Sequence, residues 1–254
     1  MKKTVELISK HFFLLLLSAV LFTSLSFAQD NGQVMSKSNL KIFVQYKLIQ
    51  KDLLTNDNIK VDVTGNQIIL SGVVPTLYDK KEAEEEAQSV DDNYVVVNNL
   101  KTENINIADS VLTKTVLNKI QSNLFYGIFD WITVSSNDGI VNLKGWVHQP
   151  WLKNQFQNEV EKIPGVVGVK NEIKNTFGPG NIGIRAARLI YNDPVFWGMQ
   201  YFANPPIHII VNNGTVILEG LVSSEALSSW AETIVRFRTD AFSVENNLQI
   251  QKRG

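Results

Sequence analysis

The chain has 254 residues with 24 basic and 25 acidic side chains, which gives a formal net charge of −1 at pH 7. This balance argues against general nucleic-acid binding, because that function needs a concentrated basic surface. The sequence contains no cysteine, which excludes both a disulfide framework and a lipid-modified amino-terminal cysteine. The length suffices for one large domain or for two to three small ones.

The first 28 residues have the pattern of a secretory signal peptide. Lysines give a positive start, the run 12–22 is apolar except for Ser18, and the small residues Ser26 and Ala28 stand where signal peptidase reads the chain. The apolar run is shorter than the roughly 20 residues of a transmembrane helix, and no later segment is apolar enough to span a bilayer. We expect cleavage after residue 28 and a periplasmic mature protein, with an uncleaved membrane anchor as the alternative.

Residues 38–106 predict one small α-β-β-α-β unit. Period-two alternation of apolar and polar residues indicates its strands, and glycines mark where the strands turn or end. The expected elements are a helix capped by Ser38 or Asn39, strands over 59–63 and 68–72 around a turn at Gly65-Asn66, a helix over 76–89 and a strand over 94–100.

Residues 107–176 repeat this order and add an aromatic connector at 124–131, after a helix over 110–122 that Asp109 can cap. Asp138-Gly139 between alternating apolar runs is a strong hairpin signal, because both central positions need positive φ. The remaining expected elements are strands from Ile132 to Gly145 around this turn, a helix over 151–162 after Pro150 and a strand over 166–173.

Residues 179–252 follow a glycine-rich linker and give the order a third time, with a second aromatic connector at 195–202. The expected elements are a helix over 182–191 capped by Asn181, a strand over 207–211, a turn at Asn213-Gly214, a strand ending at Gly220, a helix over 224–236 and a strand near 244–250. Gly214, like Gly139 in the preceding unit, is expected to be a structural turn residue.

The spacing of glycines and asparagines supports a threefold repeat. The three glycines expected to end a strand lie 73 and 75 residues apart, and each precedes an asparagine by 26 residues. These glycine–asparagine pairs are Gly72 and Asn98, Gly145 and Asn171, and Gly220 and Asn246. Because a helix between two strands favours a right-handed crossover and parallel pairing, we predict an α+β fold of three tandem units, each a mixed three-stranded sheet with two helices on one face.

This pattern resembles the BON domain, named for bacterial outer-membrane and nodulation proteins. The third copy carries its hairpin motif at 213–222, and the second carries it at 138–147 together with Gly-Val-Val-Gly-Val-Lys-Asn at 165–171. The first copy is more divergent, since its turn glycine is shifted to Gly65. The resemblance implies a periplasmic or envelope protein that binds phospholipid or assists outer-membrane maintenance and protein folding. It implies no catalytic residues and no cofactor.

The two aromatic connectors are the most unusual features and the first candidates for a contact site. Their rings suit a membrane interface, but clustered aromatic residues also form cores, so both interpretations stay open. The connector residues concerned are Phe125, Tyr126, Trp131, Phe196, Trp197, Tyr201 and Phe202. Trp151 with Lys153 at a helix start is a candidate for contact with a lipid head group. Arg185 and Arg188 are candidates for contact with anionic lipid, because arginine suits phosphate geometry.

Little in the sequence indicates catalysis. His148 and His208 are the histidines beyond the expected signal peptide, and neither lies in a nucleophile–base pattern or at zinc-ligand spacing. We expect an exported non-enzymatic protein, without metal or cofactor, that binds anionic phospholipid or envelope partners in stress protection. The alternative is a periplasmic holdase-like chaperone for outer-membrane or secreted clients. Packing between units should add stability, since each unit is near the lower size limit for a self-sufficient core.

Overall fold

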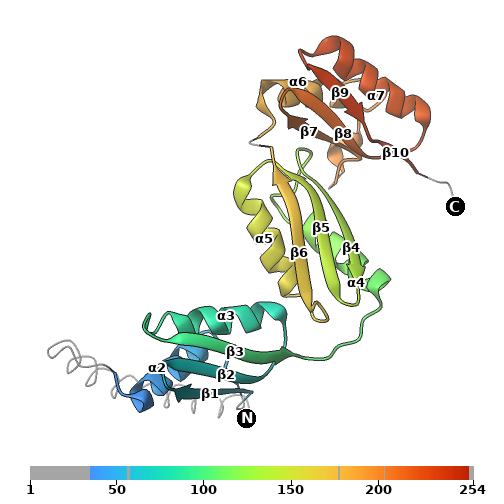
Figure 1. Ribbon diagram of the computed structural model, residues 1–254. Coiled ribbons are helices and arrows are strands. Elements are labelled where there is room, and N and C mark those ends of the chain that lie inside the picture. Colours follow the sequence, from blue (N-terminus) through green and yellow to red (C-terminus); the bar gives the residue numbers. More distant parts are fainter. Residues whose placement is uncertain (1–34, 56–57, 177, 203, 252–254) are drawn as a thin grey trace, which may run out of the picture. The chain divides into compact units, whose positions relative to one another are not determined.

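The computed structural model describes residues 35–55, 58–176, 178–202 and 204–251 (Figure 1). The expected signal peptide and its cleavage site lie outside these residues. The chain divides into an amino-terminal unit, which ends at Asn104, and a carboxy-terminal unit, which begins at Ile105. None of the helices in the described ranges combines the length and the apolarity that a membrane span requires.

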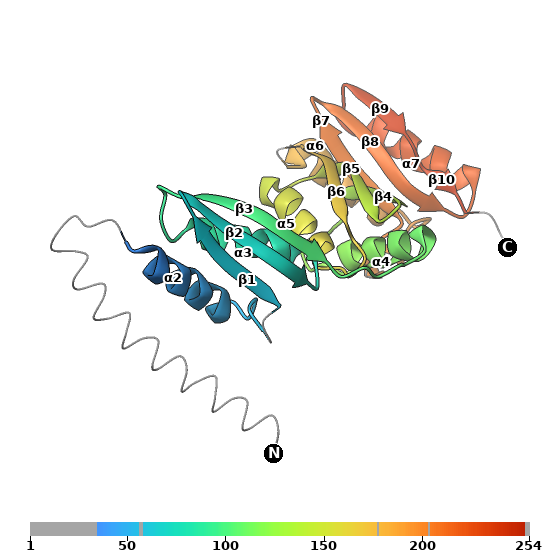
Figure 2. The same cartoon turned by 60° about the horizontal axis from the view of Figure 1, so that its bottom comes forward.

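The amino-terminal unit holds the first repeat. Its elements are α2 (Lys37–Gln50), β1 (Ile59–Thr64), β2 (Gln67–Val74), α3 (Leu77–Gln88) and β3 (Val95–Thr102). Strand β2 lies in the middle of the sheet, antiparallel to β1 and parallel to β3. Both helices cover one face of this sheet (Figure 2), and their apolar stripes meet alternate residues of the strands in a core that includes Leu40, Val61 and Leu70.

The second repeat begins the carboxy-terminal unit and has the same topology. Its elements are α4 (Asp109–Gln121), β4 (Trp131–Asn137), β5 (Ile140–Val147), α5 (Pro150–Glu161) and β6 (Gly168–Asn175). Strand β5 pairs antiparallel with β4 and parallel with β6. The parallel pairing joins residues 28 positions apart, from Ile140 with Gly168 onward, as it does between β2 and β3.

The third repeat completes the carboxy-terminal unit. Its elements are α6 (Gly180–Tyr191), the short 3-10 helix η1 (Met199–Tyr201), β7 (Ile207–Asn212), β8 (Thr215–Val222), α7 (Glu225–Arg238), β9 (Ser243–Asn246) and β10 (Gln249–Ile250). Strands β9 and β10 follow one register along β8, since Leu218 pairs with Asn246 and Leu221 with Gln249. They are thus one strand interrupted at 247–248, and the predicted α+β fold of three tandem units is confirmed.

The ends of three helices differ from the prediction. Ser36, rather than Ser38 or Asn39, caps α2, and its hydroxyl accepts a hydrogen bond from the amide of Asn39. Asp109 is the first residue of α4 rather than its cap. Its carboxylate accepts the amides of the following hairpin turn instead, with an N–O distance of 3.0 Å to Asp138. Asn181 lies inside α6, which begins at Gly180.

The glycines expected to end a strand lie inside the strands instead. Gly72, Gly145 and Gly220 have φ of 133°, 130° and 130°, a region that side chains rarely adopt. A Cβ atom at each position would overlap a backbone carbonyl oxygen of the neighbouring chain segment, that of Asn58, Trp131 and Pro206 respectively. The close approach of two backbones therefore explains why glycine recurs here.

The hairpin turns agree with the prediction in the second and third repeats. Asp138 and Gly139 have φ of 50° and 75°, and Asn213 and Gly214 have φ of 50° and 82°. Positive φ at both central positions matches the twist of the paired strands. In the first hairpin, Gly65 carries a positive φ of 59°, which is consistent with its divergent sequence.

The recurrent asparagine ties the second helix of each repeat to the last strand. In the first repeat the side-chain amide of Asn98 donates to the carbonyl oxygen of Lys80 at 2.8 Å, and its Oδ1 accepts the amide of Leu100 at 3.1 Å. The same pair of bonds recurs from Asn171 to Lys153 and Ile173, and from Asn246 to Ser228 and Leu248. The fixed interval between glycine and asparagine is therefore a structural requirement.

Candidate functional site

The segment between the first helix and the first strand differs most among the repeats. In the first repeat it is a short segment without aromatic residues, whereas the second and third repeats carry the aromatic connectors there. In the structure the second-repeat connector comprises residues 122–130, since Trp131 already belongs to β4, and the third-repeat connector comprises residues 192–206. Their side chains divide into buried anchors and exposed groups, and this division determines which of them can contact a ligand.

Two aromatic residues expected to contact lipid are buried. Tyr126 is 8% exposed, and its ring lies 6.2 Å from that of Phe156 in the second repeat. Phe196 is 0% exposed and belongs to the core of the third repeat. For these two rings the burial supports core packing, the other interpretation that the sequence left open, because each side chain anchors its connector to the domain beneath it.

An exposed apolar cluster lies at the start of the second-repeat connector. Leu124 is 97% exposed, Phe125 is 54% exposed and Trp151 at the start of α5 is 44% exposed. The rings of Phe125 and Trp151 meet edge to face, with centroids 4.9 Å apart and an interplanar angle of 82°. We call these three residues the apolar rim; the contact of its two rings joins the connector to α5.

The expected partnership of Trp151 with Lys153 is absent from this rim. Both residues belong to α5, and two successive steps along an α-helix of 3.6 residues per turn place side chains on different sides of it. Lys153 is also partly buried. The rim is therefore apolar, and Lys153 is not a neighbour that would hold a head group beside the Trp151 ring.

The third-repeat connector exposes a second set of rings around the buried Phe196. Trp197, Tyr201 and Phe202 are all well exposed. The connector is held to the domain through Asp193, whose Oδ1 accepts the indole N–H of Trp230 at 3.2 Å and the amide of Val195 at 3.0 Å.

The two candidate arginines of α6 have different surroundings. Arg185 forms an ion pair with Asp240 at 3.0 Å. Within the described ranges Arg188 has no carboxylate within ion-pair distance, and it lies at a groove of about 260 Å³. The groove is otherwise lined by Ile128, Ala187, Tyr191, Asn192 and Pro205. Arg188 is therefore the better candidate for an anionic group.

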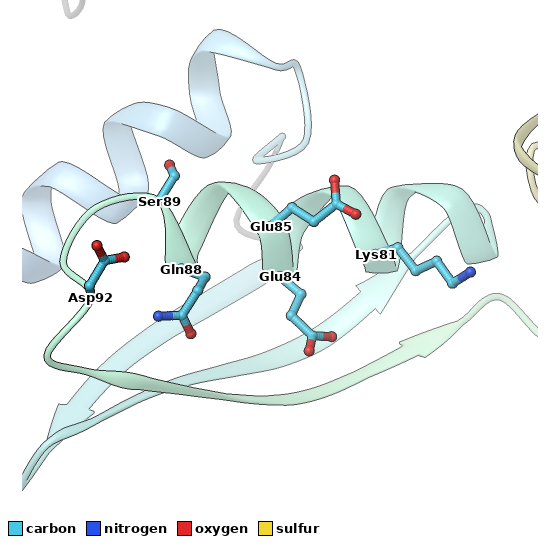
Figure 3. A pocket seen from close by; sticks show the side chains of 6 residues that line it. All are labelled: Lys81, Glu84, Glu85, Gln88, Ser89 and Asp92. Atoms are coloured by element: carbon cyan, nitrogen blue, oxygen red, sulfur yellow. The ribbon is translucent and has the colours of Figure 1, made fainter. Parts of the chain in front are cut away.

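A larger hollow in the first repeat is polar. Its volume is about 630 Å³, and its lining comes from α3 and the turn that follows. Lys81, Glu84, Glu85, Gln88, Ser89 and Asp92 line it (Figure 3). Acidic groups predominate, and Glu84 already accepts the side-chain amide of Asn98 at 2.9 Å. This surface is a solvent-exposed helix face, and no cluster of potential metal ligands occurs among the residues described.

The other side of the second-repeat connector contacts the third repeat. The carbonyl oxygen of Ile128 accepts the amide of Ile209 in β7 at 2.7 Å. The imidazole Nδ1 of His208 lies 3.2 Å from the carbonyl oxygen of Gly127. His208 is 1% exposed, so its side chain packs against another repeat. Residues about 80 positions apart make this contact, and no local sequence pattern indicates it.

A buried carboxylate fixes the shape of this connector. Asp130 is inaccessible to solvent, and its Oδ2 accepts the amide of Gly127 at 2.9 Å. Its Oδ1 accepts the backbone amide of His148 at 2.9 Å and lies 2.9 Å from Nδ1 of the same residue. The Asp130–His148 pair thus fixes the conformation of the connector. One end of the connector carries Leu124 and Phe125 of the apolar rim, and the other end contacts β7.

The fold is a tandem series of small α+β units, and its two aromatic connectors expose apolar side chains. A family model of the BON domain matches residues 44–104, 108–175 and 197–252. These segments cover more than half of the chain, which therefore belongs to the BON domain family, in tandem form. BON domains are generally linked to phospholipid or envelope binding and are not known as enzymes.

Comparison with other known proteins gives distant matches. No curated protein matches the chain. Similar solved structures include the C-terminal domain of CdsD, a structural protein of the type III secretion system of Chlamydia trachomatis, at 14% identity and a TM-score of 0.26, covering 86% of this chain and all of that one. A second CdsD structure matches at 14% identity and a TM-score of 0.26, covering 83% of this chain and 92% of that one.

Proposed function

We propose that this protein is an exported, non-catalytic envelope protein that contacts phospholipid surfaces peripherally, in stress protection. The observation that carries the proposal is the apolar rim, where Leu124, Phe125 and Trp151 expose adjoining apolar surface at a fixed loop. Exposed aromatic rings held together in this way suit the interface between head groups and acyl chains. The periplasm is the compartment proposed for it, on the basis of the signal-like first 28 residues.

Selectivity for anionic lipid is assigned to Arg188. Its guanidinium lies at a groove and lacks a carboxylate partner among described residues, whereas Arg185 one turn earlier is neutralised by Asp240. A guanidinium without a partner can bind a phosphate oxygen pair without first breaking an ion pair. Insertion of the apolar rim and attraction of an anionic head group by Arg188 thus contribute separately to vesicle binding, and each can be tested by its own substitutions.

Flotation of the full-length mature protein with phosphatidylglycerol-containing vesicles tests the proposal. Replacing Leu124 and Phe125 by serine is expected to weaken binding about fivefold or more for each residue, since partial burial of a large apolar side chain contributes about 1 kcal/mol. Phe242→Ser is the control, because Phe242 is also highly exposed but lies outside both connectors. If the variant with serine at both Leu124 and Phe125 floats as well as the wild type, the assignment of lipid contact to the apolar rim is wrong.

The arginine contribution is tested with the matched pair Arg188→Ala and Arg185→Ala. Loss of the first side chain is expected to reduce binding to anionic vesicles more than loss of the second, and neither should alter binding to phosphatidylcholine vesicles. The difference should shrink at high salt, because salt screens exposed charges. Equal effects of the two substitutions would show that net charge, rather than Arg188, governs the anionic preference.

A second candidate function is a periplasmic holdase-like chaperone. The observation that favours it is the second set of exposed rings at Trp197, Tyr201 and Phe202, since exposed apolar groups can bind unfolded clients. Suppression of client aggregation that disappears when these three residues become serine would support this function. Unchanged suppression in that variant, or none in the wild type, would exclude it.

A further inference from the structure

The second-repeat connector covers the edge of the third repeat's sheet at Ile209. Strand β7 lies at one end of the strand order β10-β8-β7, and its outward amide at Ile209 is satisfied by Ile128. An uncovered strand edge is a pairing hazard, so this contact protects the sheet. Ile128 and Phe129 also pack against the third repeat's core.

A histidine lies at the centre of this contact. Along β7, Ile207 and Ile209 belong to the core beneath α6 and α7, so the alternating residues His208 and Ile210 face the other way. Both are nevertheless buried. The imidazole lies between two rings of the second repeat, with centroids 5.6 Å from Tyr126 and 5.0 Å from Trp131.

The groups that face His208 determine how it responds to pH. Asp130 approaches from the connector and itself binds His148, while Glu219 is the residue opposite on β8. Glu219 is partly exposed, and its carboxylate accepts the side-chain amide of Asn247 at 2.9 Å. Burial raises the pKa of Tyr126, so this phenol stays neutral.

Burial is the largest influence on His208 and lowers its pKa below the ordinary value. The carbonyl oxygens of Gly127, Asp130 and Pro205 and the carboxylate of Asp130 favour the charged ring and oppose this shift without cancelling it. The closed contact therefore holds the neutral imidazole, and a charged one would be enclosed with little water.

We infer that the contact between the second and third repeats is an acid-sensitive latch, in which proton uptake by His208 releases the connector from β7. Separation would expose more of Ile128 and Phe129, which are partly buried in the closed contact, and would uncover the buried Ile210 and the β7 edge at Ile209. This inference concerns the interior of the carboxy-terminal unit and does not depend on lipid binding.

The direction of the pH effect follows from proton linkage. A histidine whose pKa is lower in the closed state than in the open state stabilises the closed state fully above the ordinary pKa of about 6.5. This stability is lost as pH falls through the window between about 6.5 and the lowered value. Within that window the ratio of open to closed molecules should rise about tenfold per pH unit, because one proton is taken up on opening.

Hydrogen exchange of the full-length mature protein between pH 7.5 and 5 tests the latch. After correction for the intrinsic exchange rate, exchange at the Ile209 amide and across the second-repeat connector should accelerate with falling pH. The hairpin of the first repeat, residues 59–74, contains no histidine and should not change. A constant opening ratio at Ile209 over this range would refute the inference.

Two substitutions identify the titrating group. His208→Asn keeps a side-chain N–H for the Gly127 carbonyl but cannot titrate, so it should abolish the pH dependence of opening. His148→Asn is the matched control, because it keeps the backbone amide and a side-chain N–H for Asp130 and also cannot titrate, and it should leave the pH dependence in place. If His208→Asn retained the pH dependence of opening, or if only His148→Asn abolished it, the assignment to His208 would be wrong.

A measurement on the unaltered protein covers the case in which His208→Asn does not fold. The pKa of the His208 imidazole, followed by NMR, should lie below that of a histidine in an unstructured peptide. A value at or above about 6.5 would contradict the latch.

Discussion

At the residue scale, a glycine and an asparagine recur in each repeat, and the structure shows a distinct structural role for each. The glycine of the second strand allows two backbones to approach, and the asparagine of the last strand bonds both the helix and its own strand. Neither role involves a ligand. Recurrence in these repeats therefore identifies scaffold residues, whereas the candidate contacts lie where the repeats differ.

The glycine role predicts a sharp difference between two glycines of the second repeat. Gly145→Ala should reduce the free energy of unfolding by about 3 kcal/mol, because φ is 130° and the new Cβ would overlap the Trp131 carbonyl oxygen. Gly127→Ala should change it by less than about 1 kcal/mol, since no atom lies within 4 Å of a Cβ there. Urea denaturation of both variants measures the difference, and similar losses would contradict the steric explanation.

The asparagine role predicts a comparable effect without a steric clash. Asn171→Ala should destabilise the protein by about 1–3 kcal/mol, because the Lys153 carbonyl and the Ile173 amide both lose their partner. Asn154→Ala on the exposed side of α5 is the control and should change stability by about 0.5 kcal/mol or less. An equally small effect of Asn171→Ala in thermal or urea unfolding would show that water replaces these bonds.

At the element scale, the two ends of the second-repeat connector have different surroundings. Leu124 and Phe125 are exposed, whereas Ile128 and Phe129 pack against the third repeat. The turn between them is held by Asp130, which bonds Gly127 and His148. The same nine-residue element therefore exposes apolar side chains at one end and joins two repeats at the other.

These two sides predict separable effects of substitution. Phe129→Ala should destabilise the contact between the second and third repeats by about 1–3 kcal/mol, and their unfolding should no longer coincide. Leu124→Ala should leave unfolding unchanged, because that side chain is almost fully exposed, while weakening vesicle binding. Differential scanning calorimetry and flotation measure the two properties, and loss of stability in Leu124→Ala would contradict this division.

At the scale of the whole molecule, the chain is a series of three small repeats of which the last two share a compact unit. A repeat of this size is close to the minimum for a self-sufficient core. The third repeat additionally buries His208 and Ile210 on the sheet face away from its own helices. Its stability should therefore depend on the second repeat.

Fragments of the chain test this dependence. Residues 179–254 alone should be less stable than the same residues within 105–254, because excision exposes the β7 edge and an apolar sheet face to water. Circular dichroism melting and analytical ultracentrifugation should show a lower melting temperature or self-association for the shorter fragment. A monomeric, fully stable third repeat would show that the contact contributes nothing to its folding.

Most of the fold follows from local sequence signals. Alternation of apolar residues located the strands, and Asp138-Gly139 and Asn213-Gly214 located the turns through their need for positive φ. Helix starts were less predictable, since Asp109 can cap a helix but bonds a distant turn instead. The candidate site was only partly predictable, because Tyr126 and Phe125 are adjacent aromatic residues with opposite exposure.

The sequence by itself determined the order of elements, the threefold repeat and the turn geometry, because these depend on residues close together in the chain. The tertiary structure alone decided which aromatic rings are exposed, which arginine is paired and that His208 is buried between repeats. Those properties depend on contacts such as Gly127 with His208, which lie 81 residues apart. The local periodicity of the sequence carries no information on contacts between residues so far apart in the chain, since the burial of these side chains is fixed only when the repeats pack.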